Sequence, residues 1–249
     1  LRECALRVHQ NGGCFYGQIY LLYAPKYPAN DFSVRYYYIT NFAATSHIYA
    51  GLYTDHESYR PIQNLYCRFA LRYAGLLYDE KLQPIEEPEK RLNVTVGGKD
   101  SDDLWWKLYT YKRPLEGKYQ IITHLVNMPA PGITKEQSTL DKQPAPMKDL
   151  TVKFAKRPSR IFLLDPEAKN QRVEIPAADL VTIQQLDAWK ILVLEYPGTC
   201  DGIVAEKVWE PDFKGKDVIP DTKDGKVFLP ITLFLTGMEG GEFYSRGKS

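Results

Sequence analysis

The sequence predicts an α+β protein in which a helical βα unit precedes an antiparallel β-sandwich. Thirteen of the 18 tyrosines lie before residue 79, whereas 27 of the 31 acidic residues lie at or beyond that position. Such a change in composition marks two units with different roles. About seven short apolar runs separated by turn residues follow the first unit, a pattern typical of a β-sandwich. The predicted boundaries are a βα unit at 1–80, a linker at 81–90, a sandwich at 91–235 and a tail at 236–249.

The first unit is predicted to run helix, strand, helix, helix. Apolar residues recur at helical spacing over 1–10, and Gly12-Gly13 ends that helix. A short apolar run at 14–20 predicts a strand, and helices are expected at about 33–53 and 59–78. One strand cannot make a parallel sheet, so this unit is expected to need partner strands that the chain does not contain. Two interpretations follow: the unit is the end of a larger α/β domain, or it is a helical cap without the strand.

Apolar and β-branched runs in the second unit predict its strands. Turn residues such as Pro114 to Gly117 separate neighbouring runs. A proline-bearing loop is expected over about 128–148, and residues 227–235 predict one further strand. The main predicted strands are 92–96, 104–111, 119–126, 150–154, 160–164, 173–175 and 190–195.

Composition and motifs exclude several classes of protein. The formal net charge is +1, which is too small to neutralise a run of phosphates, so no nucleic-acid partner is expected. No apolar run reaches the roughly 18 residues of a membrane span. The four cysteines and four histidines have no metal-binding spacing, and no nucleotide or hydrolase fingerprint occurs. We therefore expect no cofactor and no structural metal. The acidic loop at 99–103 could hold calcium, but a plain turn is the simpler interpretation.

Several runs resemble one family of bacterial enzymes. The runs at 119–127 (Tyr-Gln-Ile-Ile-Thr-His-Leu-Val-Asn), 146–154 and 186–195 are similar to the C-terminal β-sandwich of glycoside hydrolase family 66. That family contains dextranases and cycloisomaltooligosaccharide glucanotransferases. Upstream, Gly12-Gly13, the loop at 27–30 and the helix at 68–78 resemble the last barrel strand, the loop after it and the last barrel helix. The matching pieces occur in the order of the family and touch about half of the chain.

The resemblance implies the end of a (β/α)8 barrel followed by a β-sandwich, in a secreted, periplasmic or cell-surface bacterial protein. It implies a polysaccharide substrate, such as an α-glucan, cleaved by a retaining mechanism with two carboxylates. The catalytic carboxylates of the family lie on barrel strands that precede all of these pieces, so no catalytic residue is assigned here. After Gly12-Gly13 the family carries His and Glu, whereas this chain has Cys14 to Gln18, which weakens the case for dextran. The partners implied are a carbohydrate and the remainder of a catalytic barrel.

Tyrosines gather on and just after the predicted strand at 14–20. Residues at the carboxyl end of a barrel strand line the active site, and sugars stack on aromatic rings. Packing in a core is the competing interpretation for these rings. Trp105 and Trp106 should point to opposite faces of a strand, one into the core and one toward a sugar or the helical unit. The alternative functions are a carbohydrate-binding β-sandwich module and a structural interaction domain. The candidate sugar-binding residues are Tyr16, Gln18, Tyr20, Tyr23, Tyr27 and Trp106.

Overall fold

The computed structural model describes residue 8 and residues 16–18, 31–49, 60–128, 144–200, 221–223 and 226–228. The chain divides into two compact units, Leu1–Val204 and Ala205–Ser249. In the second unit, β13 (Asp221–Lys223) pairs antiparallel with β14 (Lys226–Phe228). The predicted strand at 227–235 overlaps β14, and the rest of it lies outside the described residues. The predicted helix at 1–10 is described only at Val8, which is helical.

The first part of the chain forms a parallel β-α-β arrangement followed by two helices. Strand β1 (Tyr16–Gln18) lies parallel to β2 (His47–Tyr49), and α2 (Asp31–Ala43) connects them. Next come α3 (Arg60–Arg72) and α4 (Ala74–Leu77), which fall within the predicted helix at 59–78. The expectation that the partner strand lies outside this chain is therefore wrong, because β2 supplies one.

The single helix predicted at 33–53 is also wrong beyond Ala43. The chain turns there, and Thr45 has a φ of 59°, in the left-handed region that interrupts a right-handed helix. The amide of Ser46 then donates to the carbonyl of Asn41, which closes the turn before β2 begins. Aromatic and β-branched residues in β2 favour a strand, but their apolar character also fits a buried helix.

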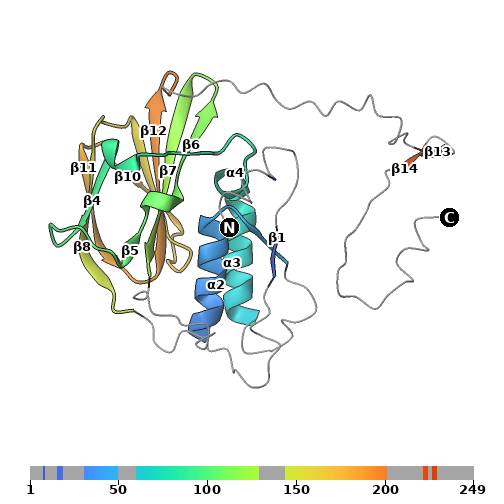
Figure 1. Cartoon of the computed structure of the whole chain (residues 1–249), viewed down its shortest axis with the longest axis horizontal. Coiled ribbons are helices and arrows are strands. Elements are labelled where there is room, and N and C mark those ends of the chain that lie inside the picture. The colour runs from blue at the N-terminus through green and yellow to red at the C-terminus, as the bar shows by residue number, and fades with distance from the viewer. Residues whose placement is uncertain are drawn as a thin grey trace. The chain divides into compact units, whose positions relative to one another are not determined.

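The rest of the first unit is a β-sandwich of two antiparallel sheets (Figure 1). A seven-stranded sheet has the order β10-β9-β12-β7-β6-β3, with β5 paired to β7, and a three-stranded sheet has the order β11-β8-β4. The predicted sandwich class is confirmed. The strands are β3 (Gln83–Pro84), β4 (Leu92–Val96), β5 (Leu104–Trp105), β6 (Thr110–Leu115), β7 (Lys118–Asn127), β8 (Met147–Phe154), β9 (Arg160–Leu164), β10 (Arg172–Ile175), β11 (Leu180–Leu186) and β12 (Trp189–Pro197).

Three regions of the sandwich differ from the prediction. The single strand predicted at 104–111 is instead β5, the 3-10 helix η3 (Lys107–Tyr109) and the start of β6. Strand β11 was not predicted, although its apolar and polar residues alternate and its buried positions include Val181 and Ile183. The predicted linker at 81–90 contains β3 and the 3-10 helix η2 (Pro88–Lys90), and Leu82 within it is 1% exposed. Its prolines and acids are typical of a linker, but Leu82 and Ile85 pack into the two cores.

The helices cover the outer face of the seven-stranded sheet. One core lies between this sheet and α2 and α3, and the second lies between the two sheets. In β7, Ile122 and Val126 join the first core, whereas Ile121 and Leu125 join the second. Both faces of β7 and β12 are therefore buried. β12 is apolar over 191–194, whereas β7 also buries the polar residues Gln120, Thr123, His124 and Asn127.

Aromatic side chains join the helices to the sheet. Ring contacts run from Tyr38 in α2 to Tyr66 in α3, from Tyr66 to Trp189, and from Trp189 to His124, with centroids 5.8–6.1 Å apart and planes within 19°. The Tyr36 hydroxyl donates to the carbonyl of Asn127 at 2.5 Å. The Tyr111 hydroxyl donates to the carbonyl of Ala43 at 2.6 Å, at the end of α2. These contacts hold α2 and α3 against the sandwich.

Candidate functional site

The carboxyl ends of β1 and β2 form one candidate site. Gln18 and Tyr49 are register partners and are the last residues of the two parallel strands. In parallel α/β units, ligands bind beyond the carboxyl ends of the strands, where the loops begin. Of the predicted sugar-binding residues, Tyr16 and Gln18 lie in β1, whereas Tyr20, Tyr23 and Tyr27 lie outside the described residues. Tyr49 belongs with this set but was missed, because its segment was assigned to a helix.

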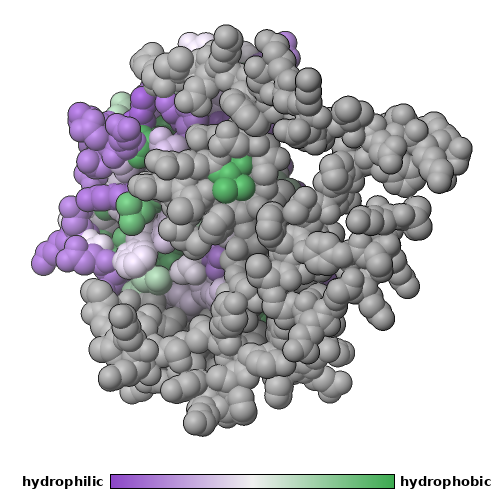
Figure 2. All heavy atoms as spheres, turned by 45° about the vertical axis from the view of Figure 1, so that its right-hand side comes forward, coloured by the Kyte–Doolittle hydropathy of each residue, from purple (hydrophilic) through white to green (hydrophobic). Residues whose placement is uncertain are grey.

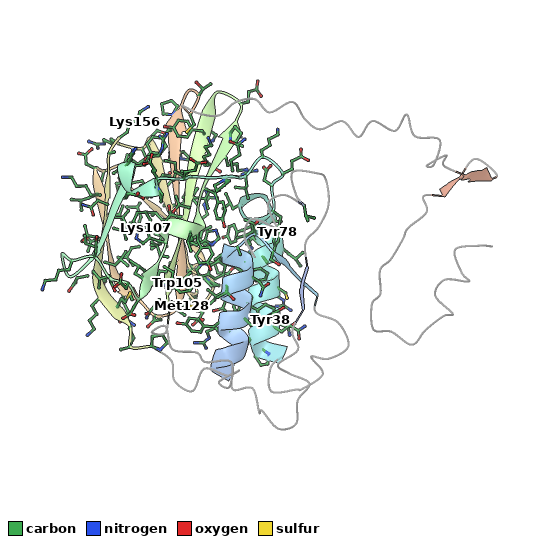
Figure 3. The ribbon with its side chains drawn as sticks, in the orientation of Figure 1. Tyr38, Tyr78, Trp105, Lys107, Met128 and Lys156 are labelled. Carbon is green, nitrogen blue, oxygen red and sulfur yellow. The ribbon has the colours of Figure 1, made fainter. Side chains whose placement is uncertain are left out.

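The two tryptophans point to different cores. Trp106 is 6% exposed and packs between the two sheets, while Trp105 is half-buried and packs against the core beneath the helices. The two rings enter different cores, as expected, but they do not lie on opposite faces of one strand, because β5 ends at Trp105 and Trp106 caps a 3-10 helix. Because little of the Trp106 ring reaches solvent, its position favours packing over sugar binding. Trp105 covers the seam between the sheet and the helices, near Met128 (Figure 3).

A second candidate site is an open groove of about 710 Å³ at one end of the sandwich, which we call the end groove. Tyr119 and Tyr196 are cross-strand partners in its floor, with ring centroids 5.0 Å apart and planes at 13°. The Lys156 ammonium lies 5.9 Å from the centroid of the Tyr196 ring. Figure 3 shows Lys156 at an end of the sandwich, away from Tyr38 in the helices. The groove is lined by Pro84, Ile85, Glu86, Glu87, Lys90, Arg91, Lys112, Tyr119, Ile121, Ala155, Lys156 and Tyr196.

Charges on the walls of the end groove are unequal. Its lining includes four cationic side chains and two carboxylates. Glu87 is paired with Lys90 at 2.5 Å. Burial raises the pKa of the Tyr196 hydroxyl, as does Tyr119, while Arg91 opposes that rise. Tyr196 is therefore neutral at physiological pH, and the cations set the sign of the local field.

One buried carboxylate, Glu195, lies on the helix-facing side of β12. Its oxygens accept from the Gln120 amide at 2.7 Å and the Lys118 ammonium at 3.1 Å. Burial favours a higher pKa for Glu195, but these hydrogen bonds and the nearby cations outweigh it and hold the pKa below its usual value. A general acid needs a raised pKa, so this environment fits an ionised structural group better than a catalytic acid.

The acidic loop at 99–103 does not gather a metal-binding cluster. Within the described ranges, no group of three or more His, Cys, Asp or Glu side chains is close enough to hold an ion. Cys67 and Cys200 are free thiols, whereas Cys4 and Cys14 lie outside the described residues. Among the helices that the structure describes, none is both long and apolar enough to span a bilayer.

The fold of this chain is similar to part of one solved glycoside hydrolase. The structure is similar to a cycloisomaltooligosaccharide glucanotransferase of Paenibacillus sp., solved in complex with cycloisomaltoheptaose, with a TM-score of 0.52 and 14% identity. The match covers 66% of this chain and 27% of that enzyme, so this chain spans about a quarter of its length. At this identity the likeness establishes the fold alone.

A second similar structure is α-L-fucosidase isoenzyme 2 of Paenibacillus thiaminolyticus. It has 18% identity and a TM-score of 0.29, and the match covers 56% of this chain and 19% of that one. A TM-score this low does not establish a common fold. No protein-family model matches the sequence, and no curated protein matches it either.

Proposed function

We propose that this chain is the carboxyl-terminal portion of a polysaccharide-degrading glycoside hydrolase, acting on an α-glucan such as dextran. The supporting observation is the β1-α2-β2-α3 order, whose parallel strands match the repeating unit of a (β/α)8 barrel. Its helices α2 and α3 bury their apolar sides on the sandwich rather than standing apart from it. A barrel that leans on a sandwich through its last helices would have this arrangement.

The proposal divides the work between the two parts of the chain. Residues at the carboxyl ends of β1 and β2, Gln18 and Tyr49 among them, would form part of the sugar-binding rim, joined by the tyrosines after β1. The catalytic carboxylates would lie on strands supplied by the remainder of the barrel, as in a retaining enzyme with two carboxylates. The sandwich would brace the barrel. We propose a secreted, periplasmic or cell-surface location, where a polysaccharide is met.

A carbohydrate-binding module without catalysis is the second candidate. The end groove favours it, because a hollow with tyrosines in its floor and polar side chains on its walls is a common form of binding site. Under this proposal the βα unit is a cap on the sandwich.

Binding and turnover of isomaltooligosaccharides and dextran distinguish these proposals. We expect calorimetry to detect weak binding by the chain, and a reducing-sugar assay to detect no hydrolysis. Gln18→Ala combined with Tyr16→Ala should abolish the binding if the strand ends form the rim. The matched control is Tyr73→Ala, a half-buried tyrosine on the other side of the helical layer.

Each result separates the candidates. Binding lost only in the Gln18/Tyr16 variant supports the hydrolase portion. Binding that survives in that variant but is lost on changing the end groove supports the autonomous module. Hydrolysis by this chain alone would overturn the placement of the catalytic carboxylates elsewhere.

A further inference from the structure

We propose that the end groove binds an acidic saccharide, with a carboxylate or sulfate group held between Arg91, Lys112 and Lys156. The proposal rests on the proposed function in one respect, that the chain handles polysaccharides. It adds a second site, remote from the carboxyl ends of β1 and β2, and names the charge of its ligand.

An inward-facing lysine is the first observation. Lys112 in β6 is the register partner of Ile121 in β7, and directly opposite residues of an antiparallel pair point to the same face. Ile121 belongs to the core between the two sheets. Lys112 therefore occupies a position that a closed sandwich would fill with an apolar side chain. It is only half-buried, because the two sheets separate at this end and leave the groove.

Two further cations stand across the groove from the other sheet. Arg91 immediately precedes β4, and Lys156 lies two residues beyond β8, which pairs with β4. Within the part of the chain that the structure describes, neither side chain is paired with a carboxylate. Arg91 is close enough to the Tyr196 hydroxyl to lower its pKa, and Lys156 lies over the Tyr196 ring. The three cations thus line the same groove as the tyrosine pair.

The floor of the end groove is apolar, in contrast to its charged walls. Ile85, Ile121 and the stacked Tyr119 and Tyr196 line the groove below the charged walls. Each is at most 8% exposed, so only the edges of these apolar side chains reach the groove. A sugar ring has an apolar face of C–H groups and a rim of polar groups. The apolar side chains in the floor complement the apolar face of the sugar. Free phosphate or another small anion would use only the cations. An acidic sugar uses the floor and the walls together.

The end groove also continues into a neighbouring hollow. This hollow, of about 250 Å³, shares Lys90, Arg91 and Ala155 with the groove and adds Lys153 from β8. Hydrophilic side chains gather on the sandwich side of the molecule, with only small hydrophobic areas between them (Figure 2). A path with repeated cations fits a chain that carries one negative charge per sugar or per disaccharide.

The test compares two double variants that remove the same charge from the same pair of strands. Arg91→Gln/Lys156→Gln changes the groove end of β4 and β8. Lys99→Gln/Lys148→Gln changes exposed residues just beyond the opposite end of β4 and at the opposite end of β8. Calorimetry measures binding of oligogalacturonate, dextran sulfate and neutral isomaltooligosaccharide to each 249-residue chain. Thermal melting confirms that both variants fold, as expected for exposed or half-buried positions.

We expect oligogalacturonate or dextran sulfate to bind the wild type and the Lys99/Lys148 variant alike. The Arg91/Lys156 variant should lose about tenfold in affinity, because it loses two charge-assisted contacts. The sugar that binds more tightly identifies the acidic group as carboxylate or sulfate. Equal losses of affinity in the two variants would mean that only the overall charge of the chain matters, and would overturn the proposal. Binding of the neutral sugar alone would overturn it while leaving the proposed function intact, whereas binding of none of the three sugars would count against both.

Discussion

Two neighbouring tyrosines of α2 should respond in opposite directions to the loss of one oxygen atom. Tyr36 is 2% exposed and its hydroxyl donates to the carbonyl of Asn127 at 2.5 Å. Tyr38 is 0% exposed, and its buried hydroxyl has no hydrogen-bond partner among the residues that the structure describes. Changing either residue to Phe keeps the ring and removes only the hydroxyl. The pair therefore isolates the energetics of a satisfied and an unsatisfied buried group.

The expected magnitudes follow from these environments. Tyr36→Phe leaves the Asn127 carbonyl without this donor, which should lower the free energy of unfolding by about 1–3 kcal/mol. For a unit of this size, each kcal/mol lowers the melting temperature by about 2–4 °C. Tyr38→Phe removes a hydroxyl that gained nothing from burial, so the free energy of unfolding should be unchanged or raised by up to about 2 kcal/mol.

Urea unfolding followed by tryptophan fluorescence measures both effects. The denaturant slope should remain that of the wild type, so that a shift in midpoint reports stability alone. A loss in Tyr38→Phe equal to that in Tyr36→Phe would refute the reasoning, because it would mean that the Tyr38 hydroxyl has a partner in the folded protein.

Three further predictions concern buried groups of the sandwich. Burial lowers the pKa of His124 to about 3, so His124 is neutral when folded, and the unfolded chain takes up the proton first as the pH falls below about 6.5. The free energy of unfolding that this residue contributes is complete above pH 6.5 and is lost progressively toward pH 3. In urea unfolding, the wild type should therefore lose about 2 kcal/mol more than His124→Phe between pH 6.5 and 5. Trp106→Ala should destabilise the sandwich by about 3–5 kcal/mol in the same assay, and a loss of sugar binding with full stability would contradict its placement in the core. Asn127→Ala removes the amide donor to the carbonyls of Ala145 and Asp187 and should cost about 2–3 kcal/mol, whereas an unchanged midpoint would show that water replaces it.

Strands were predicted correctly where burial of one or both faces produces a simple pattern of apolar residues in the sequence. The ranges 92–96 and 160–164 are β4 and β9 residue for residue, and β7 and β12 extend the predicted runs by one or two residues at their ends. The prediction for segment 33–53 failed because the apolar and aromatic residues of β2 fit a helix as well as a strand. The turn at Thr45 separates α2 from β2. A glycine would have indicated a left-handed turn in the sequence, but here a threonine adopts that φ.

The sequence predicted some residues of the first candidate site and none of the second as a site. Gln18 was predicted because it lies in the apolar run of strand length at 14–20, but its neighbour Tyr49 depends on the pairing of β1 with β2 across 31 residues. The end groove was not predicted at all. Its cations come from three separate segments, and each of them alone has the appearance of an ordinary surface charge.

The sequence by itself determined the class of most elements and the order of the two parts, because local periodicity and turn chemistry act over a few residues. It also located β7 and β12, whose runs have the length and residue types of strands. Only the tertiary structure decided what covers them. The packing of α2 and α3 on the sheet, the burial of Trp106 and the meeting of Arg91, Lys112 and Lys156 all depend on contacts between residues far apart in the chain. Such contacts are set by the shape and pairing of whole elements, and no single segment encodes them.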